Sequence, residues 1–302
     1  MNRRLSTTLA AALVSALALT ACGGGGDPLE DDASATGGAE GEGLIIGSAN
    51  FPENVLLAEI YAAALSDAGV TVTKKLNIGN REAYMAGLED GSIQLIPEYT
   101  GNLTLFLNEG AEATESDAVY AELQEALPEN LTVLDMAEAQ DKDAVVVTAE
   151  TAEEFDLVSI GDLQPHAPNM VLGGPPEWRD RYTGVPGLLE VYGLEFSSFK
   201  PLDAGSTLTV EALKNGQIDA GNIFTTDPAI AQNDFVALED PESLFAAQNV
   251  VPLIATDAVT DEIEQVLNEV SAALTTENLT EMMVQVQGAD PAQVAREFVD
   301  AL

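Results

Sequence analysis

Basic residues are scarce in this chain. Its 302 residues include 11 lysines and arginines against 51 aspartates and glutamates, which gives a formal net charge of −40. Duplex binding depends on Lys and Arg side chains that neutralise phosphates, so this balance argues against a nucleic-acid partner. Hydrophobic residues make up 46% of the sequence, so the chain can still bury a sizeable core.

Cysteine and histidine are nearly absent as well. The single cysteine excludes an internal disulfide and a cysteine-cluster metal site, and the single histidine argues against a His-rich metal centre or a Ser-His-Asp triad. That histidine, His166, stands in a loop-like Gln-Pro-His-Ala-Pro segment, and no nucleophile elbow or phosphate-binding loop is found. We therefore expect no enzyme activity, no cofactor and no metal.

The N-terminal segment has the order of a secretory signal. Arg3 and Arg4 precede an apolar run, Leu9 to Ala21, that is short for a membrane span. The tetrapeptide that ends at Cys22 (LTAC) resembles the bacterial lipobox, which predicts a signal peptide over residues 1–21 and a lipid on Cys22. The alternative is a plain signal peptide with an incidental cysteine.

Residues 22–42 are rich in Gly, Asp, Glu, Ala and Ser, a composition that cannot bury apolar surface, so we expect a flexible tether. No later run is long and apolar enough to span a bilayer. The sequence thus predicts an extracytoplasmic body that is anchored to the bacterial cell membrane by lipid, and any transport role requires separate membrane subunits.

From Gly43 onward, short β-type runs alternate with helical stretches. The pattern predicts a helix over 54–68 and strands at 43–49, 70–78, 93–96, 144–148, 171–173, 218–224, 235–238 and 250–255. Strands and helices that alternate at this spacing indicate α/β lobes with mainly parallel sheets. Residues 88–95 and 213–220 share one pattern, a helix end, a Gly turn and a strand, which reflects either two similar lobes or reuse of a common connection. Amphipathic helices at 261–274 and 291–302 are expected to pack on the first lobe.

Several segments of this body resemble the solute-binding subunits of osmoprotectant ABC importers, the glycine betaine/carnitine/choline family. The matching segments lie in family order: IGSANFPEN from Ile46, LNIGNR from Leu76, PEYTG from Pro97, AVVVT from Ala144, GL and YGL from Gly187 and Tyr192, TTD from Thr225, and LED followed by VP at Val251. The resemblance implies a two-lobed clamshell fold of the periplasmic-binding-protein type II, with ligand held between the lobes. We expect one lobe over 43–143 and 252–302 and the other over 144–251.

The resemblance also implies a ligand site. Quaternary ammonium groups donate no hydrogen bonds from nitrogen, so they are recognised by aromatic faces. Tyr99 stands at a position of the family's tyrosine cage and Phe224 offers a ring at another, while two further cage positions carry Asp143 and Gln248. Arg181 matches the arginine that holds a betaine carboxylate.

The family's carboxylate-binding lysine is missing, since Ala49 stands where many members have it. We therefore hypothesise a ligand that is choline-like, or a more polar amine or betaine than glycine betaine. Asn50 and Asn102 flank the expected cleft as candidate donors, and Trp178 could line its mouth.

Each candidate has a structural alternative. Tyr99, Phe224 and Trp178 could be packing residues, and Arg181 could form an ordinary salt bridge, including one between the lobes. Asp143 could be a solvated turn charge. Asn50 and Asn102 could serve as turn or cap residues.

The predicted partners are a small-molecule ligand and the permease and ATPase subunits of an ABC importer, and we expect the chain to be monomeric. Presentation of the ligand to a sensor is the alternative to transport. The acidity indicates adaptation to high salt or reflects an acidic, alanine-rich proteome.

Overall fold

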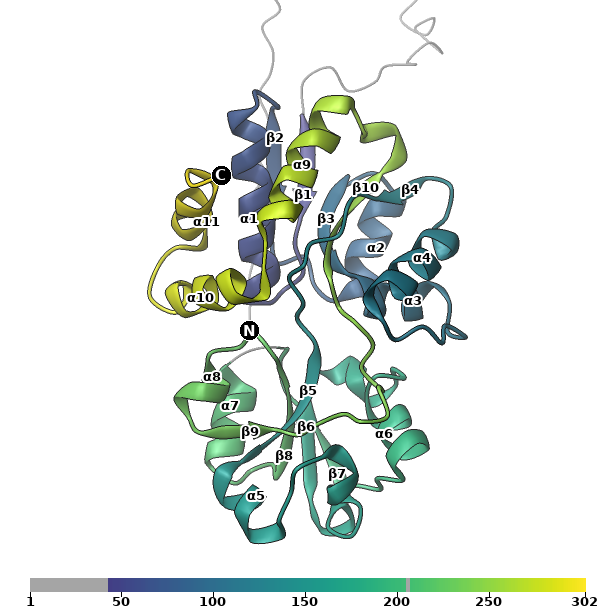
Figure 1. Cartoon of the computed structure of the whole chain (residues 1–302), viewed down its shortest axis with the longest axis vertical. Helices are drawn as coiled ribbons and strands as arrows, with labels where there is room; N and C mark the ends of the chain where they lie inside the picture. Colours follow the sequence, from purple (N-terminus) through teal and green to yellow (C-terminus); the bar gives the residue numbers. More distant parts are fainter. Residues whose placement is uncertain (1–42, 205–206) are drawn as a thin grey trace, which may run out of the picture. The chain divides into compact units, whose positions relative to one another are not determined.

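The structure is a computed structural model that describes residues 43–204 and 207–302. The predicted signal peptide, Cys22 and the tether lie outside the described residues. Two five-stranded sheets, each with its own helices, make up the described chain (Figure 1). We call them the first lobe and the second lobe.

The sheet of the first lobe takes strands from distant parts of the sequence. Its order is β2-β1-β3-β10-β4, with β1 parallel to β2 and β3, and β10 antiparallel to β3 and β4. The strands are β1 (Leu44–Gly47), β2 (Val72–Lys75), β3 (Leu95–Tyr99), β4 (Leu131–Val133) and β10 (Val250–Ala255).

The sheet of the second lobe has the order β7-β6-β8-β5-β9. Here β6 is parallel to β7 and β8, and β5 is antiparallel to β8 and β9. The strands are β5 (Asp143–Thr148), β6 (Val171–Gly174), β7 (Ser198–Pro201), β8 (Ala220–Phe224) and β9 (Phe235–Ala237).

The two sheets correspond strand for strand, and this explains the repeated sequence pattern. Gly91 (φ 76°) joins α2 (Arg81–Glu89) to β3, and Gly216 (φ 61°) joins α7 (Thr207–Lys214) to β8 at the equivalent place. Both turns need the left-handed conformation that glycine adopts without steric cost. The repeat therefore marks two similar lobes.

The predicted two-lobed α/β architecture is confirmed, although the sheets are mixed rather than mainly parallel. The chain passes from one lobe to the other before β5 and before β10. The crossing chain enters each sheet from the side where the parallel strands end, so β5 and β10 run antiparallel to their neighbours. We predicted boundaries at 143/144 and 251/252; β5 begins at Asp143 and β10 begins at Val250.

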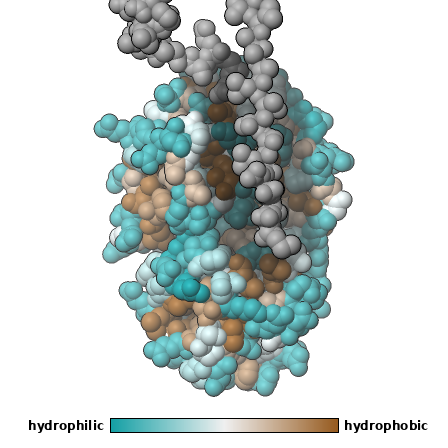
Figure 2. All heavy atoms as spheres, turned by 180° about the vertical axis from the view of Figure 1, so that it is seen from behind, coloured by the Kyte–Doolittle hydropathy of each residue, from teal (hydrophilic) through white to brown (hydrophobic). Residues whose placement is uncertain are grey.

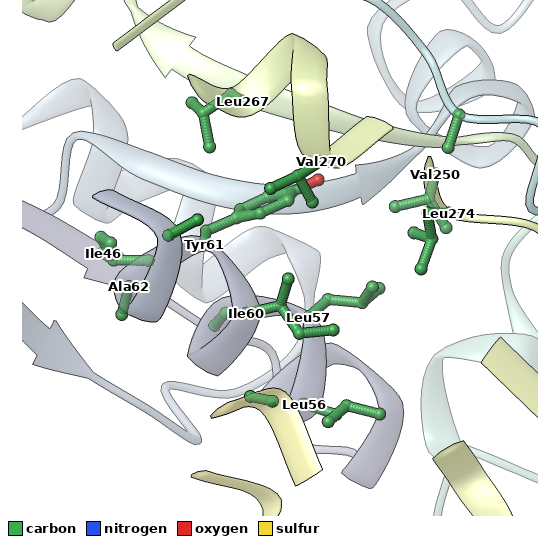
Figure 3. Packing of buried hydrophobic residues seen from close by; sticks show 14 of the residues in the cluster. Ile46, Leu56, Leu57, Ile60, Tyr61, Ala62, Val250, Leu267, Val270 and Leu274 are labelled. Atoms are coloured by element: carbon green, nitrogen blue, oxygen red, sulfur yellow. The ribbon is translucent and has the colours of Figure 1, made fainter. Parts of the chain in front are cut away.

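Helix α1 (Pro52–Asp67) forms the centre of the first lobe. Pro52 at its first position and Glu53 in its first turn favour a helix start, and Gly69 (φ 90°) follows its end. Its side chains are buried on nearly every side, because the sheet covers one face and α9, α10 and α11 cover others. Figure 3 shows Tyr61 of α1 beside Val270 of α9.

The C-terminal helices pack on the first lobe, as predicted, but they number three, because Thr275 and Asn278 form a capping box that starts α10. The other helices of this lobe are α3 (Thr100–Leu107), α4 (Ser116–Ala126), α9 (Asp261–Ala273), α10 (Thr276–Val286) and α11 (Pro291–Val299). The second lobe carries α5 (Ala149–Phe155), α6 (Val185–Tyr192), α7 and α8 (Ala229–Gln232). Short 3₁₀ turns lie at Ile160–Leu163, Ala167–Asn169, Pro176–Arg179 and Thr256–Ala258.

None of the described helices is long and apolar enough to cross a membrane. One face of the molecule is largely hydrophilic, with hydrophobic side chains in small groups (Figure 2).

Candidate functional site

A pocket lies where the two lobes meet. From the first lobe it is lined by the loop after β1, the start of α2, the end of β3 and α3; from the second lobe it is lined by residues 175–183 and the end of β8. The segment that crosses between the lobes contributes Asp141 and Asp143. Strand ends and helix starts thus converge here, which is the usual place for a ligand in α/β folds.

Three aromatic rings form one wall of the pocket. The ring centroid of Phe51 lies 6.0 Å from that of Tyr99 and 5.3 Å from that of Phe224, with interplanar angles of 32° and 51°. Each ring stands at or just after a strand end: Phe51 after β1, Tyr99 at the end of β3 and Phe224 at the end of β8. The two predicted rings are therefore brought together, and Phe51 was missed although it follows a strand.

Asp143 is buried beside this wall. Its carboxylate accepts hydrogen bonds from Asn222 Nδ2 (2.8 Å) and Asn102 Nδ2 (3.0 Å), and the residue is 7% exposed. Burial raises the pKa of this carboxyl, and the two amide bonds oppose the shift. The alternative of a solvated turn charge is wrong, because the residue is neither exposed nor in a turn.

Of the three amide side chains predicted for the site, those of Asn50 and Asn102 lie in the pocket wall and that of Gln248 lies behind it. Asn50 and Asn102 line the pocket, and Asn102 Oδ1 is buried without a hydrogen-bond partner among the described residues. Gln248 is 1% exposed and does not line the pocket. Its Oε1 accepts the backbone N–H of Asn102 (2.9 Å) in the first turn of α3, where amides have no intrahelical acceptor. Gln248 is thus a supporting residue, contrary to the prediction of a place in the pocket wall.

Both arginines of the pocket are already paired with carboxylates. Arg81 makes a bidentate bond to Glu98 through Nε and Nη2 (2.7 and 2.8 Å), and Arg181 Nη2 donates to both carboxylate oxygens of Glu82 of the opposite lobe (3.0 and 2.9 Å). The predicted Arg181 therefore lies in the pocket wall and also forms the lobe-to-lobe salt bridge that was its alternative. Arg81 was not singled out from the sequence.

Few positive groups remain for a ligand carboxylate. Ala49 stands in the wall, and its backbone N–H donates to Asn54 Oδ1 (2.7 Å). The carboxyl groups of Asp141, Asp143 and Glu177 lie in the same wall. The basic residues of this wall, Arg81 and Arg181, are thus both paired with protein carboxylates.

Trp178 and His166 lie in different parts of the second lobe. Trp178 lines the pocket and is 2% exposed, with its ring stacked on Phe245 at 6.3 Å between centroids. His166 packs on Phe155 (4.2 Å between centroids) in the second lobe and is not among the pocket residues. Among residues 43–204 and 207–302, no three His, Cys, Asp or Glu side chains are grouped to hold a metal.

A second pair of carboxyls lies behind the aromatic wall. Glu53, from the first turn of α1, is 2% exposed, and Asp141, from the crossing segment, is 6% exposed. Thr226 bonds to both: its hydroxyl donates to Glu53 Oε2 (2.5 Å) and its N–H donates to Asp141 Oδ1 (3.0 Å). The Tyr99 hydroxyl donates to Glu53 Oε1 (2.8 Å), which connects the pair to the pocket.

Comparison with known proteins gives a consistent result. Residues 42–301 match the family model described as the substrate binding domain of ABC-type glycine betaine transport systems (OpuAC). The glycine-betaine-binding protein of Pseudomonas aeruginosa is 28% identical over 240 residues, which cover 74% of this chain and 75% of that protein. A chemotactic signal transduction substrate-binding protein, CosB, of Halobacterium salinarum is 24% identical, covering 76% of this chain and 75% of the relative.

Solved structures share the fold. A crystal structure described as a glycine betaine/carnitine/choline ABC transporter superposes with a TM-score of 0.68 at 21% identity. The match covers 85% of this chain and 98% of that one.

Proposed function

Since the chain belongs to the family of substrate-binding domains of ABC-type glycine betaine transport systems, we propose that it captures a quaternary ammonium cation of the choline type and delivers it to a membrane permease. The chain then acts outside the cytoplasm, held to the membrane through a lipid on Cys22, with permease and ATPase subunits as partners. Asp143, Asn102 and Asn50 join the aromatic residues as ligand contacts in this proposal, whereas Arg181, which the resemblance assigned to a betaine carboxylate, lines the same pocket paired with Glu82.

The observation that supports this proposal most directly is the aromatic wall beside Asp143, a carboxyl group that forms no salt bridge among the described residues. Phe51, Tyr99 and Phe224 pack side by side and all line the pocket, and a desolvated cation over aromatic faces gains about 2 kcal/mol. Asp143 supplies negative charge at that wall, whereas Arg81 and Arg181 are already neutralised. A cation is thus favoured over a betaine, whose carboxylate would meet Asp143 without a free basic partner.

Calorimetric titration of the purified protein, after unfolding and refolding to remove carried-over ligand, tests this proposal. We expect choline to bind more tightly than glycine betaine or carnitine. Phe51→Leu should weaken choline binding about tenfold through loss of a ring face, and Phe298→Leu is the matched control, because Phe298 is also half-buried but lies on α11. Low-micromolar binding of glycine betaine that is unaffected by Asp143→Ala would refute the preference for a cation.

Ligand presentation to a sensor is the second candidate, and the similarity to a chemotactic substrate-binding protein supports it. Uptake of labelled choline and movement along a choline gradient, each compared with and without the chain, separate the two roles. Chain-dependent uptake supports transport, whereas a chain-dependent tactic response without uptake supports the sensor role.

A further inference from the structure

Glu53 and Asp141 bring two carboxyl groups together at a place where water cannot screen them. They are 2% and 6% exposed, and Thr226 donates one hydrogen bond to each of them. Thr225 Oγ1 also donates to Asp141 Oδ1 (3.2 Å). The four residues come from both lobes and from the segment that crosses between them, so the pair lies at the junction itself.

Among residues 43–204 and 207–302, the groups that hydrogen-bond to this pair carry no positive charge. Tyr99 approaches from β3, Thr225 and Thr226 approach from the segment after β8, Asp227 adds a further negative charge, and Asp143 lies two residues along the chain. Within the described ranges, neither Glu53 nor Asp141 forms a salt bridge with a lysine or arginine.

Two buried carboxylates without a cation cannot both stay ionised, because desolvation and mutual repulsion each disfavour the second charge. Burial raises the pKa of Glu53, and burial together with the nearby Glu53 charge raises the pKa of Asp141. The pair is therefore a coupled unit that retains one proton above the usual carboxyl range.

We propose that Glu53 and Asp141 share one proton in the unliganded protein and that a cationic ligand, on entering the adjoining pocket, displaces this proton to solvent. This inference rests on the proposed function for its ligand class. The step is balanced, since one O–H bond of the pair is broken, one proton leaves and one positive charge enters. The net charge of the site is the same before and after.

The position of the pair explains why the ligand would exchange with the proton. Asp141 lines the pocket directly, and Glu53 is joined to the aromatic wall through the Tyr99 hydroxyl. A cation held by the rings then offsets the second carboxylate, as the proton did before. A zwitterion brings no net charge, so it should displace little of the proton.

Choline chloride is the probe for this coupling. Its Kd should fall about tenfold for each unit by which the pH is raised, as long as the unliganded pair holds its proton, because one proton leaves per ligand bound. The heat of binding should change between buffers of different ionisation enthalpy, in proportion to the released proton. Glu53→Gln, which removes one titrating carboxyl, should abolish both effects. The matched control Glu89→Gln alters an exposed glutamate at the end of α2 and should behave like the natural chain.

A measurement without ligand tests the shared proton separately. A carboxyl whose pKa is raised by folding stabilises the protein at pH values below the unfolded pKa of about 4, and that contribution is lost as the pH rises through the folded pKa. As the pH rises above about 4, the melting temperature of the natural chain should therefore fall relative to that of Glu53→Gln.

The outcomes separate this inference from the proposed function. Choline binding without proton release, or release that persists in Glu53→Gln, would overturn the inference and leave the proposed function intact. Failure of choline to bind at any pH would overturn both the proposed function and the displacement step. A melting difference that does not vary with pH would show that no proton is shared.

Discussion

Replacement of Arg81 by methionine tests whether a largely buried ion pair stabilises the fold around the pocket. Glu98, its partner, has no exposed surface and accepts four hydrogen bonds, from Arg81 Nε, Arg81 Nη2, the Tyr84 hydroxyl (2.6 Å) and the Tyr99 N–H (2.9 Å). Arg81→Met removes the two charged donors and leaves a buried carboxylate with two neutral ones. The remaining donors do not offset a full charge.

The size of the effect follows from burial. Removing one partner of a buried ion pair typically costs about 3–5 kcal/mol of unfolding free energy. The pair of Arg296 with Asp67 has similar bidentate geometry, with both distances at 2.8 Å, but its side chains are 40% and 52% exposed. An exposed pair contributes about 1 kcal/mol or less, so Arg296→Met is the matched control.

Urea unfolding of the two variants measures the difference. We expect Arg81→Met to lose at least about 2 kcal/mol more than Arg296→Met. Addition of Glu98→Gln to Arg81→Met should restore part of the loss, because it removes the uncompensated charge. If Arg81→Met and Arg296→Met lose the same unfolding free energy, burial does not determine the strength of this pair and the reasoning fails.

Two further predictions concern the surface and the backbone. The formal charge of −40 should destabilise the folded state at low ionic strength, so the melting temperature should rise from low to molar NaCl, and a flat or falling curve would argue against salt adaptation. Gly184→Ala should cost about 1–3 kcal/mol of unfolding free energy, because a Cβ there would lie 1.8 Å from the Trp178 carbonyl oxygen. At the control position, Gly288, no atom lies within 4 Å of an added Cβ, so Gly288→Ala should be nearly neutral.

Much of the fold follows from local sequence patterns. The helix predicted over 54–68 is observed as Pro52–Asp67, and the strand predicted at 250–255 has those bounds. The direction of β5 and β10 was not predictable in the same way, because it depends on which edge of the sheet the crossing chain reaches. Periodicity reports burial of a strand and not its orientation.

The candidate site was predictable where the sequence matches the motifs of a known family. Tyr99 and Phe224 were selected because they stand at cage positions of the family that the sequence resembles, and both line the pocket. Gln248 was misplaced because the resemblance assigns it a position and not an orientation: it precedes β10, and its side chain turns to the backbone N–H of Asn102 instead of the pocket.

The carboxyls could not be selected from the sequence. Glu53 and Asp141 are two of 51 acidic residues, and nothing local separates them from a solvated charge. What makes them distinctive is burial by partners far along the chain, such as Thr226, which is 173 residues from Glu53. Long-range contacts of this kind set the chemistry of a buried acid.

Strand β10 has a consequence for the order in which a growing chain can fold. It lies between β3 and β4 in the sheet, and β4 has no other partner strand among the described residues. All strands of the second lobe lie between residues 143 and 237, so its sheet can form before residue 255, the last residue of β10, has been synthesised. Until that residue has been synthesised, unpaired strand edges keep the first lobe unfinished, so the first lobe completes its sheet after the second lobe can.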